Sequence, residues 1–198
     1  MILKRCFDFT AALSGIIILA PVGIGIALLI WLESGLPIFF RQTRIGLNGI
    51  SFTMLKFRTM TVKKGTESGS FDAGSSARIT GIGRILRKTK LDEFPQLWNV
   101  MIGDMSIVGP RPEVPQWVKV YPECWKQVLT VKPGITDNAA IEFRNEEEIL
   151  GQSTDPQSTY RNEILPKKLA LYEKYTANNS FTGDILIIFR TIWTIFGR

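Results

Sequence analysis

The chain has 198 residues, enough for one domain with a sizeable core, and 24 Lys and Arg against 18 Asp and Glu give it a net charge of +6. This excess favours anionic partners such as phosphates, anionic lipid headgroups or nucleic acid, without choosing among them. The absence of histidine excludes Ser-His-Asp and Cys-His catalysis and every His-ligated metal site. The two distant cysteines, Cys6 and Cys124, form neither a disulfide framework nor a zinc pattern, which suits a reducing cytoplasm.

An uncharged apolar run extends over 24 positions from Phe9 to Leu32. As a straight helix it would be about 36 Å long, slightly more than a bilayer core of ~30 Å requires, and it is too long for a cleaved signal peptide. Pro21 divides the run into halves that would each rise only about 18 Å. Basic residues flank both ends, and basic residues prefer the cytoplasmic side. The sequence therefore predicts a re-entrant membrane helix-hairpin at residues 1–35, broken at Pro21; a single kinked span is the alternative.

Residues 36–198 are predicted to form one compact cytoplasmic catalytic domain of the α/β class, mostly α, with a small β element, docked on the membrane interface. Short extended segments are expected at 36–60 and a mobile polar loop at 61–77. Helices are expected at 81–90, 92–102, 113–131 with breaks near Pro115 and Pro122, 162–175 with a break near Pro166, and 184–196. The last helix is apolar on nearly every side and too short to span a membrane. It is either a core helix or an interfacial helix, and Arg190 and Trp193 favour the interface.

The segment Thr89–Leu97 contains the adjacent acids Asp92 and Glu93. Because Pro95 is tolerated only in the first turn of a helix, the helix is predicted to start near Leu91 or Asp92. Both carboxylates would then lie at the positive end of the helix dipole, which favours their ionised form. An ionised carboxylate in such a place can attack phosphorus or bind a divalent metal. The alternative is that the pair simply caps the helix, as acids at helix starts often do.

Basic residues supply further candidates for a phosphate site. Arg111 lies between Pro110 and Pro112, so its backbone has little freedom, and a preorganised guanidinium suits bidentate phosphate contacts. The alternative is an arginine that pairs with a nearby acid. Lys56 and Arg58 alternate with apolar residues, a pattern that by itself is typical of a solvent-exposed strand face.

Together these segments resemble the monotopic phosphoglycosyl transferases, the polyprenyl-phosphate sugar-phosphate transferases that begin many bacterial glycoconjugate pathways. Four stretches carry the resemblance, in the order and spacing of the family, and the apolar N-terminus matches as well. The stretches are Lys56–Met60, Leu91–Val100, Gly103–Pro112 and Lys132–Thr136.

The resemblance implies a two-step reaction at the inner membrane, with the catalytic domain on the cytoplasmic face. Asp92 attacks the phosphate next to the sugar of a nucleotide diphosphate-sugar, with uridine as the expected base, and polyprenyl phosphate then takes the phospho-sugar from Asp92. Mg²⁺ is the implied cofactor, with Asp92 as its ligand, and Glu93 orients groups or accepts a proton. Lys56, Arg87 and Arg111 are implied to bind phosphate, a role that suits a reaction driven by charge neutralisation. Membrane lipid is an implied partner and nucleic acid is not; the oligomeric state stays open.

One stretch departs from the family pattern. After Thr136 many members continue with Gly-Trp/Leu-x-Gln-Val-x-Gly-Arg-Asn, whereas this chain keeps only Arg144 and Asn145 of that pattern within residues 137–145. Arg144 is a further candidate for substrate binding, but the donor sugar cannot be inferred from better-known members. Two other functions stay open: a membrane-anchored, Mg²⁺-dependent phosphohydrolase that uses the same Asp92, and a non-catalytic protein whose basic surface binds anionic lipid or nucleic acid.

Overall fold

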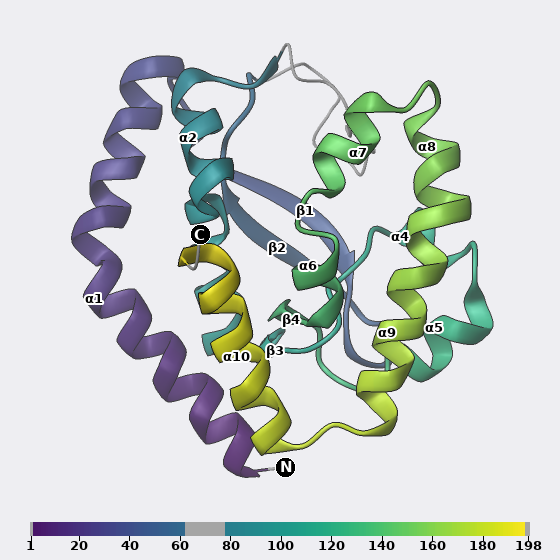
Figure 1. The fold of residues 1–198 in the computed structure, drawn as a ribbon. Helices are drawn as coiled ribbons and strands as arrows, with labels where there is room; N and C mark the ends of the chain where they lie inside the picture. Colours follow the sequence, from purple (N-terminus) through teal and green to yellow (C-terminus); the bar gives the residue numbers. More distant parts are fainter. Residues whose placement is uncertain (1, 62–77, 197–198) are drawn as a thin grey trace.

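The computed structural model describes residues 2–61 and 78–196, so the polar loop predicted at 61–77 falls almost entirely outside the described residues. The described chain is mostly helical, with two small two-stranded sheets, in agreement with the predicted class. In Figure 1 the long helix α1 follows one side of the molecule and the helices α4, α5, α8 and α9 form the other, with the sheets and α6 between them. The elements in chain order are α1 Ile2–Ser34, β1 Phe39–Ile45, β2 Ser51–Phe57, α2 Gly81–Thr89, α3 Gln96–Ile102, β3 Ser106–Val108, α4 Pro115–Val118, α5 Pro122–Val128, β4 Gly134–Thr136, α6 Asn138–Glu142, α7 Glu146–Gln152, α8 Pro156–Thr159, α9 Leu165–Ala177 and α10 Phe181–Phe196.

Helix α1 passes through Pro21 and forms one continuous helix of 33 residues, which changes direction along its length (Figure 1). The structure thus has one bent helix where the sequence predicted a hairpin of two halves broken at Pro21. A proline removes one backbone hydrogen bond and bends a helix, but the turns on either side can continue it. Entry and exit through the same membrane face stays a prediction.

One stripe of α1 packs against the rest of the molecule, chiefly against α3, with further contacts to β3 and α2. Its buried residues are Asp8, Ala12, Gly23, Ile26 and Ile30, whose spacing follows the helical repeat. The remaining faces expose large apolar side chains, including Ile17, Ile18, Ile24 and Leu32. A soluble helix would hardly leave so much apolar surface uncovered, so these faces are suited to lipid.

Both ends of α1 are tied to the same body of the protein. Near its start, Arg5 donates to two carbonyl oxygens in the last turn of α3 at 2.6 and 2.7 Å, and Asp8 accepts from the second residue of β3 at 3.0 Å. At its end, Glu33 accepts from the first amide of α2 at 2.7 Å, and Ser34 accepts from Arg58 at 2.6 Å. These contacts fix the full length of α1 against the domain.

The strands β1 and β2 form an antiparallel hairpin that runs from Phe39↔Phe57 to Ile45↔Ser51. The turn between them uses left-handed backbone at Asn48 and Gly49, a conformation that asparagine and glycine tolerate best. The expected extended segments are therefore confirmed. The hairpin places Lys56 near the end of β2, where it faces the chain that follows α2.

The strands β3 and β4 form a small parallel pair, which the sequence did not predict. The chain just after β3, at Gly109, crosses the first residue of β4, Gly134. A Cβ atom on Gly134 would lie 2.1 Å from the amide nitrogen of Gly109, so the two backbones are in direct contact. The contact joins the third and fourth family-like stretches and holds the segment that carries Arg111.

The helices of the other side form their own core around Trp125, Tyr160, Leu165 and Tyr172. The predicted breaks near Pro115 and Pro122 are confirmed, because the region 113–131 contains the two short helices α4 and α5. The break expected near Pro166 is not found: α8, a π-helical turn (Tyr160–Ile164) and α9 follow one another without a gap, and Pro166 lies in the first turn of α9. Helix α10 is not a core helix. Its exposed side chains include Leu186, Phe189, Ile192 and Trp193.

Candidate active site

The acidic pair lies on a short 3-10 turn, Leu91–Glu93, between α2 and α3. Lys90 ends α2 in the left-handed conformation, which turns the chain sharply enough to bring the pair back over β2. The α-helix itself begins at Gln96, after Pro95, so its predicted start near Leu91 or Asp92 is wrong by about one turn. The dipole of α3 is accordingly a weaker influence on the two acids than their cationic neighbours, because its effect is confined to the first turn.

Glu93 is held by two cations. Lys56 donates to its carboxylate at 2.9 Å, and Arg111 contacts both of its oxygens in a two-pronged ion pair. Burial would raise the pKa of Glu93, but the charges of Arg111 and Lys56 and their hydrogen bonds lower it far below its usual range. Glu93 is therefore a permanent anion that brings Lys56 and Arg111 together, and it is poorly suited to accept a proton.

Asp92 is in the opposite condition. It is only 8% exposed, and its Oδ1 atom is buried without a hydrogen-bond partner among the described residues. Burial raises the pKa of Asp92, the positive charge of Lys56 opposes this, and the negative charge of Glu93 adds to it. A buried, uncommitted carboxylate oxygen is costly unless something binds it, and such atoms are common where a protein binds a ligand or performs chemistry.

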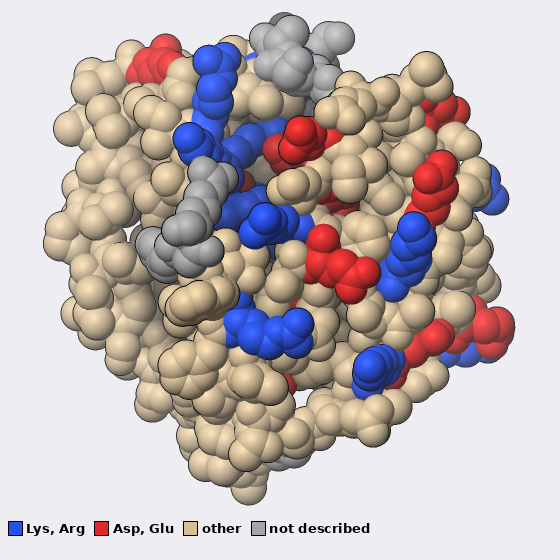
Figure 2. Space-filling view, viewed as in Figure 1, with Lys and Arg blue, Asp and Glu red and all other residues tan. Residues whose placement is uncertain are grey.

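The cations of the site are largely buried, which corrects the solvent-exposed face expected for the strand around Lys56 and Arg58. Burial lowers the pKa of Lys56, while Glu93 raises that of Arg111. Arg58 does not reach the acidic pair; its side chain, on a residue only 5% exposed, binds the end of α1. Figure 2 shows basic side chains gathered in the middle of one face, between α2 and α7.

Arg87 lies in the last turn of α2, near the site but outside the ion-pair cluster. Its Nε atom donates to the hydroxyl of Thr59 at 3.0 Å, and its other end meets the exposed Glu147 of α7 at 3.3 Å. The hydroxyl contact depends on a close approach of α2 to the chain after β2, since a Cβ atom on Gly83 would lie 2.1 Å from the carbonyl oxygen of Thr59. Sequence reasoning missed Thr59, although it lies in the family-like stretch with Lys56.

Arg144 is not brought to the cluster. It is exposed on the turn between α6 and α7, and within the described part of the chain it has no hydrogen bond or ion pair with Asp92, Glu93, Lys56 or Arg111. Sequence reasoning also missed Asp137 and Tyr172, which are both buried and influence the pKa of Arg111. Asp137 follows the carboxyl end of β4, and Arg111 follows the carboxyl end of β3. Because these strands pair in parallel, the two residues lie at the same edge, and their proximity could not be foreseen without the pairing.

A magnesium ion fits this set of residues only together with a substrate. No group of three or more acidic or cysteine side chains that could hold a metal occurs in the described residues. Asp92 offers one free carboxylate oxygen, whereas the oxygens of Glu93 are occupied by cations. Mg²⁺ is commonly bound by one or two carboxylates, substrate phosphates and water, so Asp92 and a diphosphate together form a suitable donor set.

The family model for bacterial sugar transferases matches residues 1–198. An uncharacterized sugar transferase, EpsL, of Bacillus subtilis is 43% identical over 73% of this chain and 71% of its own length. The exopolysaccharide production protein PSS of Rhizobium leguminosarum is 37% identical over 97% of this chain and 94% of its own. The UDP-glucose:undecaprenyl-phosphate glucose-1-phosphate transferase of Escherichia coli is 35% identical over 98% of this chain, which spans only 40% of that longer protein.

These matches confirm the resemblance that the four stretches indicated. They also exclude the hypothesis of a non-catalytic protein whose basic surface binds anionic lipid or nucleic acid, because the matched proteins are transferases by family and by name. The site agrees, since its buried acid, its paired anion and its two cations are all contributed by the stretches that carried the resemblance. The chain belongs to the bacterial sugar transferase family of enzymes.

Proposed function

We propose that this chain transfers a phospho-sugar from a uridine diphosphate-sugar to polyprenyl phosphate, in the form of undecaprenyl phosphate, and so begins the synthesis of a bacterial polysaccharide or other glycoconjugate. The observation that carries the proposal is the unequal state of the two acids: Asp92 has a buried free oxygen, and Glu93 is fully engaged with Lys56 and Arg111. The names of the relatives support the class of donor and acceptor and favour transfer over the hydrolase alternative.

In the first step, the carboxylate of Asp92 attacks the phosphorus next to the sugar. A bond forms between a carboxylate oxygen of Asp92 and phosphorus. The bond from phosphorus to the oxygen that bridges the two phosphates breaks, and the nucleoside monophosphate leaves with the electron pair. Lys56 and Arg111 lie beside Asp92 as fixed positive charges that can stabilise the charge on the phosphoryl oxygens. Both cations form their ion pairs with Glu93, so neither of them occupies the free Oδ1 atom of Asp92.

In the second step, an oxygen of polyprenyl phosphate attacks the same phosphorus. The bond between phosphorus and Asp92 breaks, the carboxylate is restored, and the product is a polyprenyl diphosphate-sugar. Where Mg²⁺ is bound, Asp92 and the substrate phosphates would hold it, and it would neutralise charge on the phosphates. Arg87, which lies in the last turn of α2 and contacts Thr59, is assigned to the phosphates of the donor.

A lipid-linked acceptor agrees with the surface of the molecule. The side formed by α1 and the lower half of α10 shows almost no charged side chain in Figure 2, and both helices expose large apolar residues. Because both ends of α1 are tied to one domain, a straight crossing would draw parts of that domain to opposite membrane faces. We therefore assign a monotopic arrangement, with α1 and α10 in the cytoplasmic leaflet and the site at its surface.

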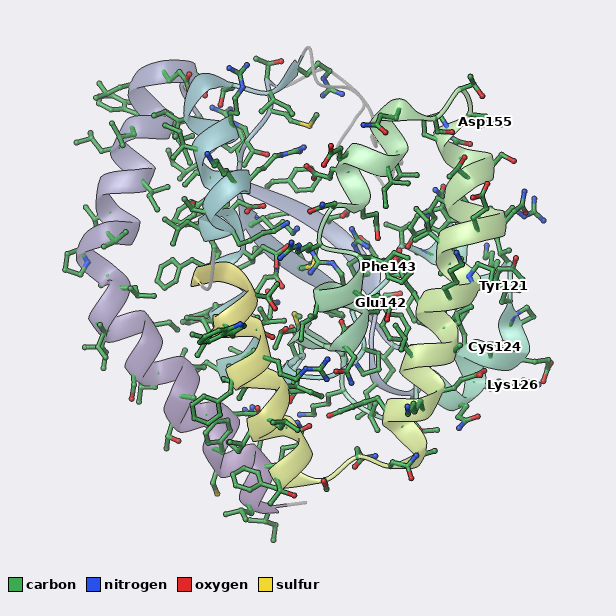
Figure 3. All side chains as sticks on the ribbon, viewed as in Figure 1. Tyr121, Cys124, Lys126, Glu142, Phe143 and Asp155 are labelled. Atoms are coloured by element: carbon green, nitrogen blue, oxygen red, sulfur yellow. The ribbon has the colours of Figure 1, made fainter. Side chains whose placement is uncertain are left out.

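The test is a search for the covalent intermediate in the full chain. The enzyme is incubated with a uridine diphosphate-sugar and Mg²⁺ without acceptor, and intact-protein mass spectrometry should show a phospho-sugar adduct. Asp92→Asn should show no adduct. Asp155→Asn, which changes an exposed acid on the side of the molecule opposite α1, should behave like wild type (Figure 3). An adduct that persists in Asp92→Asn rejects Asp92 as the nucleophile, and release of free sugar phosphate without acceptor would favour a hydrolase.

A further inference from the structure

Side chains from two helices, Lys4 and Tyr175, contact one backbone oxygen, the carbonyl of Val108, and Asp184 from a third helix binds both of them. Lys4 of α1 donates to it at 2.9 Å and Tyr175 of α9 approaches it at 3.3 Å. Asp184 of α10 binds both donors, accepting from Tyr175 at 2.7 Å and forming an ion pair with Lys4. We refer to Lys4, Tyr175 and Asp184 as the Val108 clamp.

The clamp is largely buried although it contains two opposite charges. Asp184 is 3% exposed, and the side chain of Lys4 is 19% exposed. Burial and the neighbouring carboxylate of Asp184 raise the pKa of Tyr175, so its hydroxyl stays a proton donor. A buried ion pair is expensive to desolvate and often stabilises a fold less than apolar packing would, so stability alone is a weak explanation for it. A better explanation is that the ion pair holds Val108 and the three helices in one specific arrangement.

The clamped carbonyl is three residues before Arg111. From there the backbone is held at successive points: the amide of Gly109 donates to Thr136 at 3.1 Å, and the carbonyl of Pro110 accepts from Gly134 at 3.0 Å. Beyond Arg111, the carbonyl of Pro112 accepts from Arg44 at 2.9 Å. The clamp adds to this chain of contacts a link to α1 and α10, the two helices with the largest exposed apolar faces.

We propose, building on the function proposed above, that Lys4, Tyr175 and Asp184 are positioning residues that hold Arg111 in register with Glu93 and the donor diphosphate. Through them the seating of α1 and α10 in the membrane determines the geometry of the first half-reaction. The clamp does not touch the reacting atoms; it acts through Val108 and the short rigid segment that follows. A simple staple between helices would stabilise the fold but would leave Arg111 unaffected.

The variants that separate these two roles are Tyr175→Phe, which removes one hydroxyl, and Lys4→Met, which removes one charge at similar length. Matched controls are Tyr121→Phe, just before α5, which loses an exposed hydroxyl contact, and Lys126→Met, in α5, which loses an exposed ion pair. Both residues lie on the opposite side of the molecule from α1 (Figure 3). The full chain in detergent is assayed for nucleoside monophosphate release from a uridine diphosphate-sugar, and its melting temperature is measured in parallel.

Both clamp variants should lower kcat/KM by roughly tenfold or more, since small misplacements of a binding group have effects of this size. The controls should stay within about twofold of wild type, because exposed pairs contribute little. In an Arg111→Lys background, Tyr175→Phe should cause less than about a threefold further loss, because residues that act through one another are not additive. The affinity for uridine diphosphate, measured by calorimetry, should fall in the two clamp variants and stay close to that of wild type in the two controls.

A lower melting temperature with unchanged kcat/KM in Tyr175→Phe and Lys4→Met would overturn the proposal and leave a structural staple. Equal losses from Tyr175→Phe in the wild-type and the Arg111→Lys backgrounds would also overturn it. If the wild-type chain releases no nucleoside monophosphate, the proposed function fails instead. The binding measurement then decides on the clamp alone, which is rejected if Tyr175→Phe binds uridine diphosphate as tightly as wild type does.

Discussion

Gly109 and Gly134 touch backbone to backbone, so close that a Cβ atom on Gly134 would lie 2.1 Å from the Gly109 nitrogen and 2.5 Å from its carbonyl oxygen. The two glycines belong to separate stretches of the sequence, Gly103–Pro112 and Lys132–Thr136. Through their contact the second stretch supports the backbone that presents Arg111. The site is thus built on a crossing of the start of β4 and the loop after β3, which admits no side chain at Gly134.

Gly134→Ala should therefore lower both stability and activity. Backbone cannot yield as a flexible side chain can, so we expect a loss of at least about 2 kcal/mol in the free energy of unfolding. Gly151→Ala in α7 is the matched control, because a Cβ atom there meets nothing within 4 Å. Thermal melting and nucleoside monophosphate release measure the two effects, and a Gly134→Ala variant as stable as Gly151→Ala would contradict the crossing.

Helix α1 should influence the acidic pair through Gly23. A Cβ atom on Gly23 would lie 2.9 Å from the ring of Phe94, the residue directly after Glu93, whereas a Cβ atom on Gly25 meets nothing within 4 Å. Gly23→Leu and Gly25→Leu add the same apolar side chain to the same helix, two residues apart. We expect a loss of activity of roughly tenfold or more for Gly23→Leu only, because the ring must move. The measurement is kcat/KM at equal amounts of membrane-extracted protein, and equal values for the two variants would exclude this coupling.

Glu93 should make stability depend on pH in acid. Its folded-state pKa lies below its ordinary value of 4.5 because Arg111 and Lys56 hold the anion, so its contribution is complete above that value and is lost as the pH falls toward the folded-state pKa. Glu93→Gln should remove this slope, and at neutral pH it should cost about 3 kcal/mol, since it leaves two largely buried cations without their shared partner. Chemical unfolding between about pH 3 and pH 6 tests the sign, and identical slopes in wild type and Glu93→Gln would refute it.

The monotopic assignment predicts that both ends of α1 are reached from the same side of the membrane. Leu3→Cys and Leu36→Cys place thiols at residues that are 66% and 72% exposed, in a background with Cys6 and Cys124 changed to Ser. In intact spheroplasts neither thiol should react with an impermeant maleimide, and both should react after lysis. Reaction of one thiol alone in intact spheroplasts would show that α1 crosses the membrane.

Local chemistry along the chain was enough to predict several of the helices, the breaks at Pro115 and Pro122, the extended segments of β1 and β2, and the candidates Asp92, Glu93 and Arg111, whereas Lys56 was indicated only by the family resemblance. Each of the local predictions depends on residues that are close in sequence, such as an apolar run, a proline or a pair of acids. The hairpin at Pro21 was expected on the same grounds and was replaced by one bent helix, because packing along α3 and contacts at both ends carry α1 through the proline.

The sequence alone determined that a protein without histidine must work with carboxylates and cations, and it identified Asp92 and Glu93 as the acids to consider. The tertiary structure decided how the surroundings of the two acids differ. Glu93 is saturated by Lys56 and Arg111, which come from positions 37 residues before it and 18 residues after it, while Asp92 keeps a free buried oxygen. Ion pairing acts over a few ångströms in space and does not depend on distance along the chain, so the different surroundings of two neighbouring carboxylates are set by residues far from both in the sequence.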